Sequence, residues 1–191
     1  VCLRAGAPTA ATLGRVWVSI GGFVYLFWCL SFLIKLFFLV PGVQGRLLLL
    51  YLVAVTKAAD VGAYVVGTAT SRRPQGNHKL VPRISPKKSW EGLLGGIFFS
   101  VSVSVLLVWA LHARVTLSGA PVLGMLSGVL FGVAAPLAGL LGDLAESSLK
   151  RVAKARDSGR VPGLGGALDV LDSLIPVGPL FFAYITLLVA A

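Results

Sequence analysis

Charged residues are scarce in this sequence of 191 residues. Asp, Glu, Lys and Arg make up 13% of it, whereas roughly 25% is typical of soluble domains. Hydrophobic residues make up 57%, and the mean hydropathy is +0.90. The only two cysteines, Cys2 and Cys29, give neither a disulfide framework nor the spacing of metal ligands. This composition excludes an ordinary soluble domain and indicates a polytopic membrane protein.

Common phosphate-binding motifs are absent as well. The sequence has no P-loop ending in Gly-Lys-Ser/Thr and no GxGxxG after a strand. Residues 1–13 lack the basic start and apolar run of a secretory signal. Because the chain begins with Val1 rather than Met, we expect it to be incomplete at its N-terminus. With no internal repeat or low-complexity linker, a single membrane-embedded domain over residues 1–191 is expected.

Five apolar runs approach the roughly 20 residues that a membrane-spanning helix needs. Backbone polar groups in lipid must be satisfied within the segment, so these runs are predicted to be helices. The expected fold class is therefore all-α, a polytopic membrane protein with about five transmembrane helices. The predicted spans cover residues 16–40, 47–67, 92–112, 120–142 and 168–190.

Lys and Arg residues concentrate in two of the connections between these runs. Two spans separate the two connections, so both are predicted on one face, and the positive-inside tendency makes that face cytoplasmic. Nucleic acid is not an expected partner, because the cations adjoin membrane spans without a recognition fold. Eleven of the seventeen basic residues are involved, namely Arg72, Arg73, Lys79, Arg83, Lys87, Lys88, Lys150, Arg151, Lys154, Arg156 and Arg160.

All seven acidic residues lie in or beside the same two connections. Asp60 interrupts the second apolar run, where an ionised carboxylate costs about 2.5–3.5 kcal/mol. It is therefore a candidate functional residue, with Lys57 as a candidate partner. A purely structural Lys–Asp pair is the alternative. The acids are Asp60, Glu91, Asp143, Glu146, Asp157, Asp169 and Asp172.

Two pairs of these acids are spaced three residues apart, Asp143 with Glu146 and Asp169 with Asp172. On a helix this spacing puts both side chains on one face. Adjacent carboxylates repel each other unless a cation lies between them or they share a proton. Mg2+ is usually bound by one or two carboxylates and substrate phosphates, so Asp169 and Asp172 are predicted to hold metal. The alternative is that they cap a helix N-terminus.

The basic connections suit phosphate-bearing ligands. The second one ends in a glycine-rich turn before an apolar helix, and helix N-termini bind phosphate readily. Acids that can bind metal, clustered cations and this turn are all predicted on one membrane face. Together they indicate phosphoryl or nucleotidyl transfer at the cytoplasmic interface, where metal and cations offset charge on the transferring group.

The stretch SLKRVAKARDSGRVPGLGGALDVLDS resembles the signature of phosphatidate cytidylyltransferases, also called CDP-diacylglycerol synthases. Upstream, DVGAYVVG, HKLVPRISPKKSWEG and GDLAESSLKR resemble further segments of that family, so the resemblance covers roughly residues 47–180. Three positions depart from the family pattern. Arg156 replaces a Lys, Leu164 a His and Val170 an Arg, and the last two changes remove polar contacts to substrate or metal. Signature positions are matched by Ser147, Lys150, Arg151, Asp157, Gly165, Gly166, Asp169 and Asp172.

The resemblance implies that CTP and phosphatidate react to give CDP-diacylglycerol and pyrophosphate, with Mg2+ required. It implies metal binding by Asp143, Asp169 and Asp172. The substrate-binding and charge-neutralising set would comprise Asp60, Ser85, Lys87, Lys88, Ser147, Lys150, Arg151, Arg156, Gly165 and Gly166. The expected surroundings are a lipid bilayer, with a bacterial inner membrane favoured by the short connections. A homodimer is left open.

Three other functions stay open. A CTP-dependent polyprenol kinase would use the same nucleotide but deliver phosphate to an alcohol. A cation-coupled transporter would use Asp60, Asp169 and Asp172 as a cation path, although transporters more often place such acids near mid-membrane in repeated halves. A weakened relative, suggested by Leu164 and Val170, would bind CTP or lipid without efficient turnover.

Overall fold

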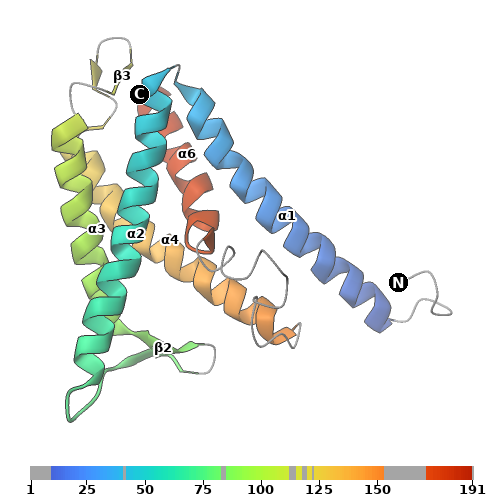
Figure 1. The fold of residues 1–191 in the computed structure, drawn as a ribbon. Helices are drawn as coiled ribbons and strands as arrows, with labels where there is room; N and C mark the ends of the chain where they lie inside the picture. The colour runs from blue at the N-terminus through green and yellow to red at the C-terminus, as the bar shows by residue number, and fades with distance from the viewer. Residues whose placement is uncertain are drawn as a thin grey trace.

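The computed structural model of this chain describes residues 10–40, 42–82, 85–111, 115–117, 120–121, 123–152 and 171–190. Within these ranges the chain forms five helices and two short antiparallel hairpins (Figure 1). The all-α fold class predicted from the sequence is confirmed. The helices are α1 (Ala10–Leu39), α2 (Val43–Ser71), α3 (Trp90–Leu111), α4 (Met125–Val152) and α6 (Leu174–Ala190).

The helices account for the predicted spans, with one difference in length. By length and composition, α1, α2, α3 and α4 can each cross a membrane, and the chain is an integral membrane protein. Helix α6 has 17 residues, which at about 1.5 Å per residue is shorter than a usual span. The predicted fifth span began at residue 168, but residues 168–170 lie outside the described part of the chain.

The connections alternate between the two ends of the bundle (Figure 1). The hairpin of β1 (Lys79–Val81) and β2 (Ser85–Ser89) lies at the same end as the last turns of α4. The hairpin of β3 (Thr116–Leu117) and β4 (Ala120–Pro121) lies at the opposite end, near the link between α1 and α2. The described parts of both basic connections therefore share one end, as the charge pattern predicts.

Small residues bring α2 and α3 into close contact. A Cβ atom added at Gly62 would lie 2.7 Å from the carbonyl oxygen of Gly95, and one added at Gly96 would lie 3.0 Å from that of Ala59. Membrane helices use such residues to let their backbones approach. This contact places Asp60, next to Ala59, beside the start of α3 and the hairpin that precedes it.

An aromatic cluster fills the half of the bundle farther from the β1–β2 hairpin. Tyr51, Phe131 and Phe181 are fully buried, with ring centroids 4.5–5.7 Å apart. The Tyr51 hydroxyl lies 2.6 Å from Ser104 Oγ, which donates to the Gly128 carbonyl at 2.6 Å. Because a serine has one hydroxyl proton, Tyr51 is the donor in the first bond. This chain of bonds ties α2, α3 and α4 together inside a dry core.

Two elements differ from the predicted course of the chain. The fourth span was predicted over residues 120–142, but Ala120–Pro121 form β4 and α4 begins only at Met125. The apolar span of α4, Met125–Ala145, ends close to the predicted position, and the helix continues to Val152, so Asp143 and Ser147 are helical. The basic connection after α2 was predicted as a loop, but it pairs as β1 and β2. In both segments the backbone N–H and C=O groups find partners within regular structure, which needs no apolar side chains.

Candidate functional site

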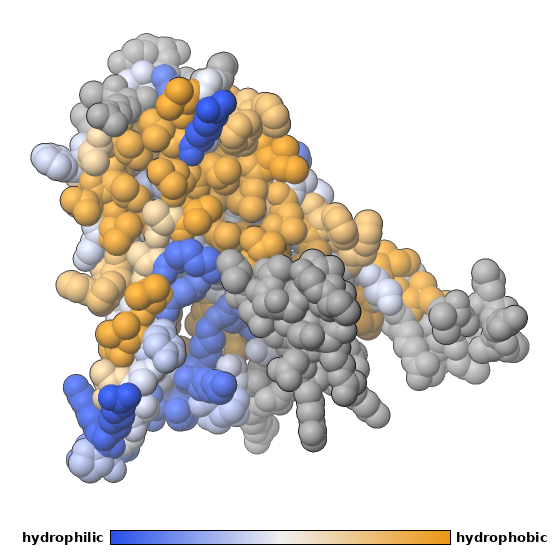
Figure 2. Space-filling view, viewed as in Figure 1, coloured by the Kyte–Doolittle hydropathy of each residue, from blue (hydrophilic) through white to orange (hydrophobic). Residues whose placement is uncertain are grey.

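A cavity of about 360 Å3 opens between α2, α3, α4 and the β1–β2 hairpin. Its apolar wall includes Leu80, Leu93 and Leu140. Figure 2 shows hydrophilic residues gathered at this end of the molecule, below a continuous apolar surface. The cavity therefore joins a charged region to an apolar one. The lining residues with polar side chains are Asp60, Tyr64, Lys87, Lys88, Ser89, Asp143 and Asp172.

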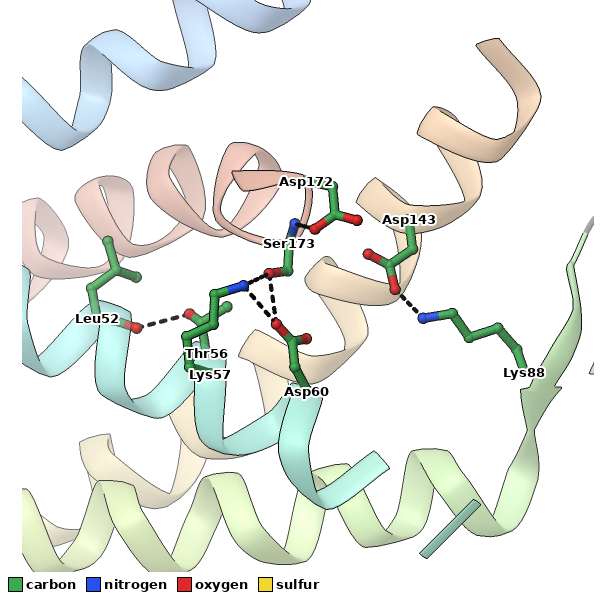
Figure 3. Close-up of polar contacts among 8 residues, drawn as sticks. All are labelled: Leu52, Thr56, Lys57, Asp60, Lys88, Asp143, Asp172 and Ser173. Atoms are coloured by element: carbon green, nitrogen blue, oxygen red, sulfur yellow. Dashed lines mark hydrogen bonds and ion pairs between the residues drawn. The ribbon is translucent and has the colours of Figure 1, made fainter. Parts of the chain in front are cut away.

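Lys88 of β2 and Asp143 of α4 form an ion pair inside this cavity (Figure 3). Both side chains are largely shielded, with 33% of Lys88 and 20% of Asp143 exposed. The family resemblance implied that Lys88 binds a phosphate and that Asp143 binds a metal ion. In this structure the two side chains neutralise each other. The pair also fastens the hairpin to α4 across 55 residues of sequence.

A second polar cluster links the middle of α2 to the start of α6 (Figure 3). Lys57 Nζ donates to Asp60 Oδ2 at 2.8 Å and to Ser173 Oγ at 3.0 Å. Ser173 Oγ in turn donates to Asp60 Oδ2 at 2.9 Å. The structure thus shows the Lys57–Asp60 pair suggested by the sequence and adds Ser173, which sequence reasoning missed. The available signal was a serine directly after the motif residue Asp172 and before an apolar helix.

Asp172 is held at the junction of α6 and α4. Its Oδ1 accepts a hydrogen bond from the backbone N–H of Ser173 at 2.6 Å. On the α4 side, a Cβ added at Gly142 would lie 2.5 Å from the Asp172 carbonyl oxygen and 2.7 Å from Pro176 Cγ. Only a glycine lets these segments approach so closely. Asp143, the next residue along α4, therefore lines the same cavity as Asp172.

The β1–β2 hairpin is anchored to both helices that flank it. His78 Nδ1 lies 2.7 Å from Glu91 Oε1, and the His78 N–H donates to both Glu91 carboxylate oxygens at 3.1 Å. The Trp90 N–H donates to the His78 carbonyl at 3.0 Å, and Asn77 Nδ2 donates to the Gly67 carbonyl at 3.0 Å. These hydrogen bonds hold in place the hairpin that carries Lys87 and Lys88.

Several predicted site residues cannot be placed in the cavity. Ser85 lies on β2 and Ser147 on α4, but neither lines it. Lys150 and Arg151 belong to the last turn of α4, and their side chains are not described. The other predicted or departing residues lie outside the described ranges, namely Arg156, Asp157, Leu164, Gly165, Gly166, Asp169 and Val170.

The donor atoms in the cavity suit a hard divalent cation. Asp143 contributes a carboxylate from α4 and Asp172 one from the turn before α6, and Mg2+ usually takes one or two carboxylates along with phosphates and water. No group of three His, Cys, Asp or Glu side chains with metal-binding geometry occurs among the residues that the structure describes. Of the three predicted ligands, Asp143 and Asp172 line the cavity, whereas Asp169 lies outside the described residues, so the metal assignment stays a prediction.

Comparison of the sequence with protein families and curated proteins finds several matches. A model described as cytidylyltransferase family matches residues 5–188. The phosphatidate cytidylyltransferase of Haemophilus influenzae is 38% identical over 142 residues, 74% of this chain and 46% of that protein. The enzyme of that name from Brucella suis is 37% identical over 174 residues, 90% of this chain and 57% of the relative. An uncharacterized Escherichia coli protein, YnbB, is 38% identical over 142 residues, 74% of this chain and 43% of that protein. The chain spans about half the length of these curated relatives.

Proposed function

This chain belongs to the cytidylyltransferase family, and we propose that it transfers the cytidylyl group of CTP to phosphatidate. The products are CDP-diacylglycerol and pyrophosphate. One observation carries the proposal: carboxylates and ammonium groups from α2, β2, α4 and the turn before α6 line one cavity, whose remaining lining is largely apolar. The names of the relatives from Haemophilus influenzae and Brucella suis support the same reaction.

The reaction needs no nucleophile from the protein. A phosphate oxygen of phosphatidate attacks the α-phosphorus of CTP, forming a new P–O bond, and the bond between the α- and β-phosphates breaks as pyrophosphate leaves. Catalysis then consists of holding the two substrates in line and offsetting their negative charge. Lys87 and Lys88 line the cavity and are the described cations that we assign to the phosphates.

Mg2+ is the cofactor that we propose for this cavity. Asp143 and Asp172, together with Asp169, would hold it, and the bound ion supplies positive charge to phosphate oxygens. The chain's own contribution is the placement of Asp143 on α4 and of Asp172 in the turn before α6. Lys88 neutralises Asp143 in the structure, so metal binding would require this lysine to release the carboxylate and turn to a substrate phosphate.

The proposed orientation puts the cavity on the cytoplasmic side of a bacterial inner membrane. Support comes from the charge pattern, since the cavity lies at the end of the bundle that carries both described basic segments. Its apolar wall suits the glycerol and upper acyl part of a lipid, while the charged wall suits phosphates. A homodimer stays a prediction.

A substrate comparison tests the proposal. The purified protein is incubated with CTP labelled at the α-phosphate, Mg2+, and either phosphatidate or a polyprenol. We expect labelled CDP-diacylglycerol and pyrophosphate from phosphatidate, and loss of both in Asp143→Asn and Asp172→Asn. Phosphorylated polyprenol with release of CDP would instead show the kinase. Full activity in both Asn variants would contradict the metal assignment.

A further inference from the structure

Ser173 has two connections that meet at the proposed metal site. The residue is only 1% exposed. Its hydroxyl belongs to the cluster with Lys57 and Asp60 on α2, while its backbone N–H holds the carboxylate of Asp172. A single residue therefore joins an ion pair inside a membrane span to a predicted metal ligand.

The cluster leaves no freedom for the Ser173 hydroxyl. Its one proton goes to Asp60 Oδ2, and its oxygen accepts from Lys57 Nζ, so the hydroxyl uses its single donor and one of its two acceptor positions. The same two partners bind each other at 2.8 Å. Because all three contacts are 3.0 Å or shorter, rotation of the serine or displacement of its backbone breaks two bonds at once.

The presence of Lys57 within a membrane span is not explained by contact with the cavity. Asp60 lines the cavity and Lys57 does not. Their side chains are 32% and 40% exposed, and partly exposed ion pairs of this kind add little to stability. Ionisable residues within membrane spans are costly and usually functional. A positioning role explains why Lys57 binds Asp60, a residue of the cavity lining, without lining the cavity itself.

Helix α4 restrains the same turn from the other side. Gly142 approaches the Asp172 backbone so closely that a Cβ atom there would lie 2.5 Å from its carbonyl oxygen. Residues 171–173 are thus held between the polar cluster on α2 and the glycine on α4. The two restraints together fix where the Asp172 carboxylate lies relative to Asp143, its neighbour in the cavity.

We infer that Lys57 and Ser173 are positioning residues of the metal site, which set the Asp172 carboxylate for cation binding through the Lys57–Asp60–Ser173 cluster. The inference rests on the proposed function to the extent that it takes Asp172 as a metal ligand. Neither Lys57 nor Ser173 lines the cavity, so neither is assigned a direct contact with metal or substrate. Loss of a hydrogen-bonding partner behind a metal ligand typically costs about 10–100-fold in metal affinity or activity.

Direct binding of Mn2+ tests this without relying on turnover. The full chain is purified in detergent, and free Mn2+ is measured by electron paramagnetic resonance during a titration. We expect Ser173→Ala and Lys57→Met each to raise the Kd for Mn2+ about 10-fold or more, and Ser173→Thr, which keeps the hydroxyl, to restore most of the affinity. Asp172→Asn serves as the reference for loss of a ligand.

Ser100→Ala is the matched control. Ser100 is fully buried, and its hydroxyl donates across to the Val55 carbonyl of α2 at 3.4 Å, yet it does not line the cavity. The variant removes the same atom from the helix packing and should leave Mn2+ affinity unchanged. A lower melting temperature for Ser173→Ala with wild-type Mn2+ affinity would show a purely structural role and overturn the inference.

The double variant tests whether Lys57 acts through Ser173. Adding Lys57→Met to Ser173→Ala should raise the Kd for Mn2+ no more than about twofold further, because the link is already broken. If the double variant instead raised the Kd for Mn2+ by the product of the two single fold-changes, Lys57 would not act through Ser173. Wild-type protein that binds Mn2+ but makes no CDP-diacylglycerol would contradict the proposed function alone, whereas wild-type protein that binds no Mn2+ would overturn this inference.

Discussion

A methyl group at Gly142 would collide with the turn that carries Asp172. In Gly142→Ala the new Cβ would lie 2.5 Å from the Asp172 carbonyl oxygen and 2.7 Å from Pro176 Cγ. Ordinary contacts of this kind begin at 3.4 Å, so the backbone must move by about 0.9 Å. A misplacement near 1 Å can cost about 100-fold in rate. We therefore expect cytidylyl transfer to fall by roughly that factor, while overpacking lowers stability by about 1–3 kcal/mol.

Gly139→Ala is the control for this prediction. Gly139 lies one turn earlier on α4, and a Cβ there would lie 3.6 Å from Ser173 Cβ, an ordinary contact. Replacing a helical glycine by alanine stabilises the helix by about 1 kcal/mol, so activity should be kept and the melting temperature should rise. Both variants are compared by turnover of labelled CTP and by thermal unfolding in detergent. Equal activity of Gly142→Ala and Gly139→Ala would refute the argument that this contact sets the site.

Three further predictions concern other contacts of the bundle. Lys88→Met removes a cation assigned to the phosphates, so the KM for CTP should rise about 10-fold. It also frees Asp143 from its ion partner, so the Mg2+ concentration for half-maximal activity should fall. A rise in both values would contradict the pairing of Lys88 with Asp143. Gly95→Ala brings a Cβ to 2.5 Å from Val66 and should lower the melting temperature, whereas Gly67→Ala, with its nearest contact at 3.6 Å, should not. Tyr51→Phe loses the hydrogen bond to α3 and should cost about 0.6–1.7 kcal/mol of unfolding free energy at unchanged KM, which denaturant titration and kinetics together can check.

The sequence predicts the helices well because hydropathy reports burial in lipid directly. Apolar runs place the ends of α1, α2 and α3 within six residues of the observed ends. The continuation of α4 beyond the predicted span has a physical reason. Hydropathy falls at Asp143, but a helix satisfies its own backbone hydrogen bonds and can continue into a polar region, here to Val152.

The arrangement of the site is harder to predict from spacing. The positions of Asp143 and Asp172 could be proposed from motif resemblance, but the partners of these residues could not. Lys57 and Ser173 are 116 residues apart, and Lys88 and Asp143 are 55 apart. Such pairs are decided by how the helices pack, and that packing depends on where glycines such as Gly142 allow close approach. No local pattern encodes these contacts.

The position of the aromatic cluster bears on the transporter alternative. A cation path through the bundle would have to continue from the cavity past Tyr51, Phe131 and Phe181, whose side chains are at most 1% exposed. Within the described part of the chain, the one hydroxyl of this cluster is bound to Ser104 and faces no open polar space. The cavity itself is lined by charged groups and by apolar side chains such as Leu93 and Leu140. This lining suits the proposed reaction between a nucleotide and a lipid headgroup better than passage of an ion past the described aromatic cluster.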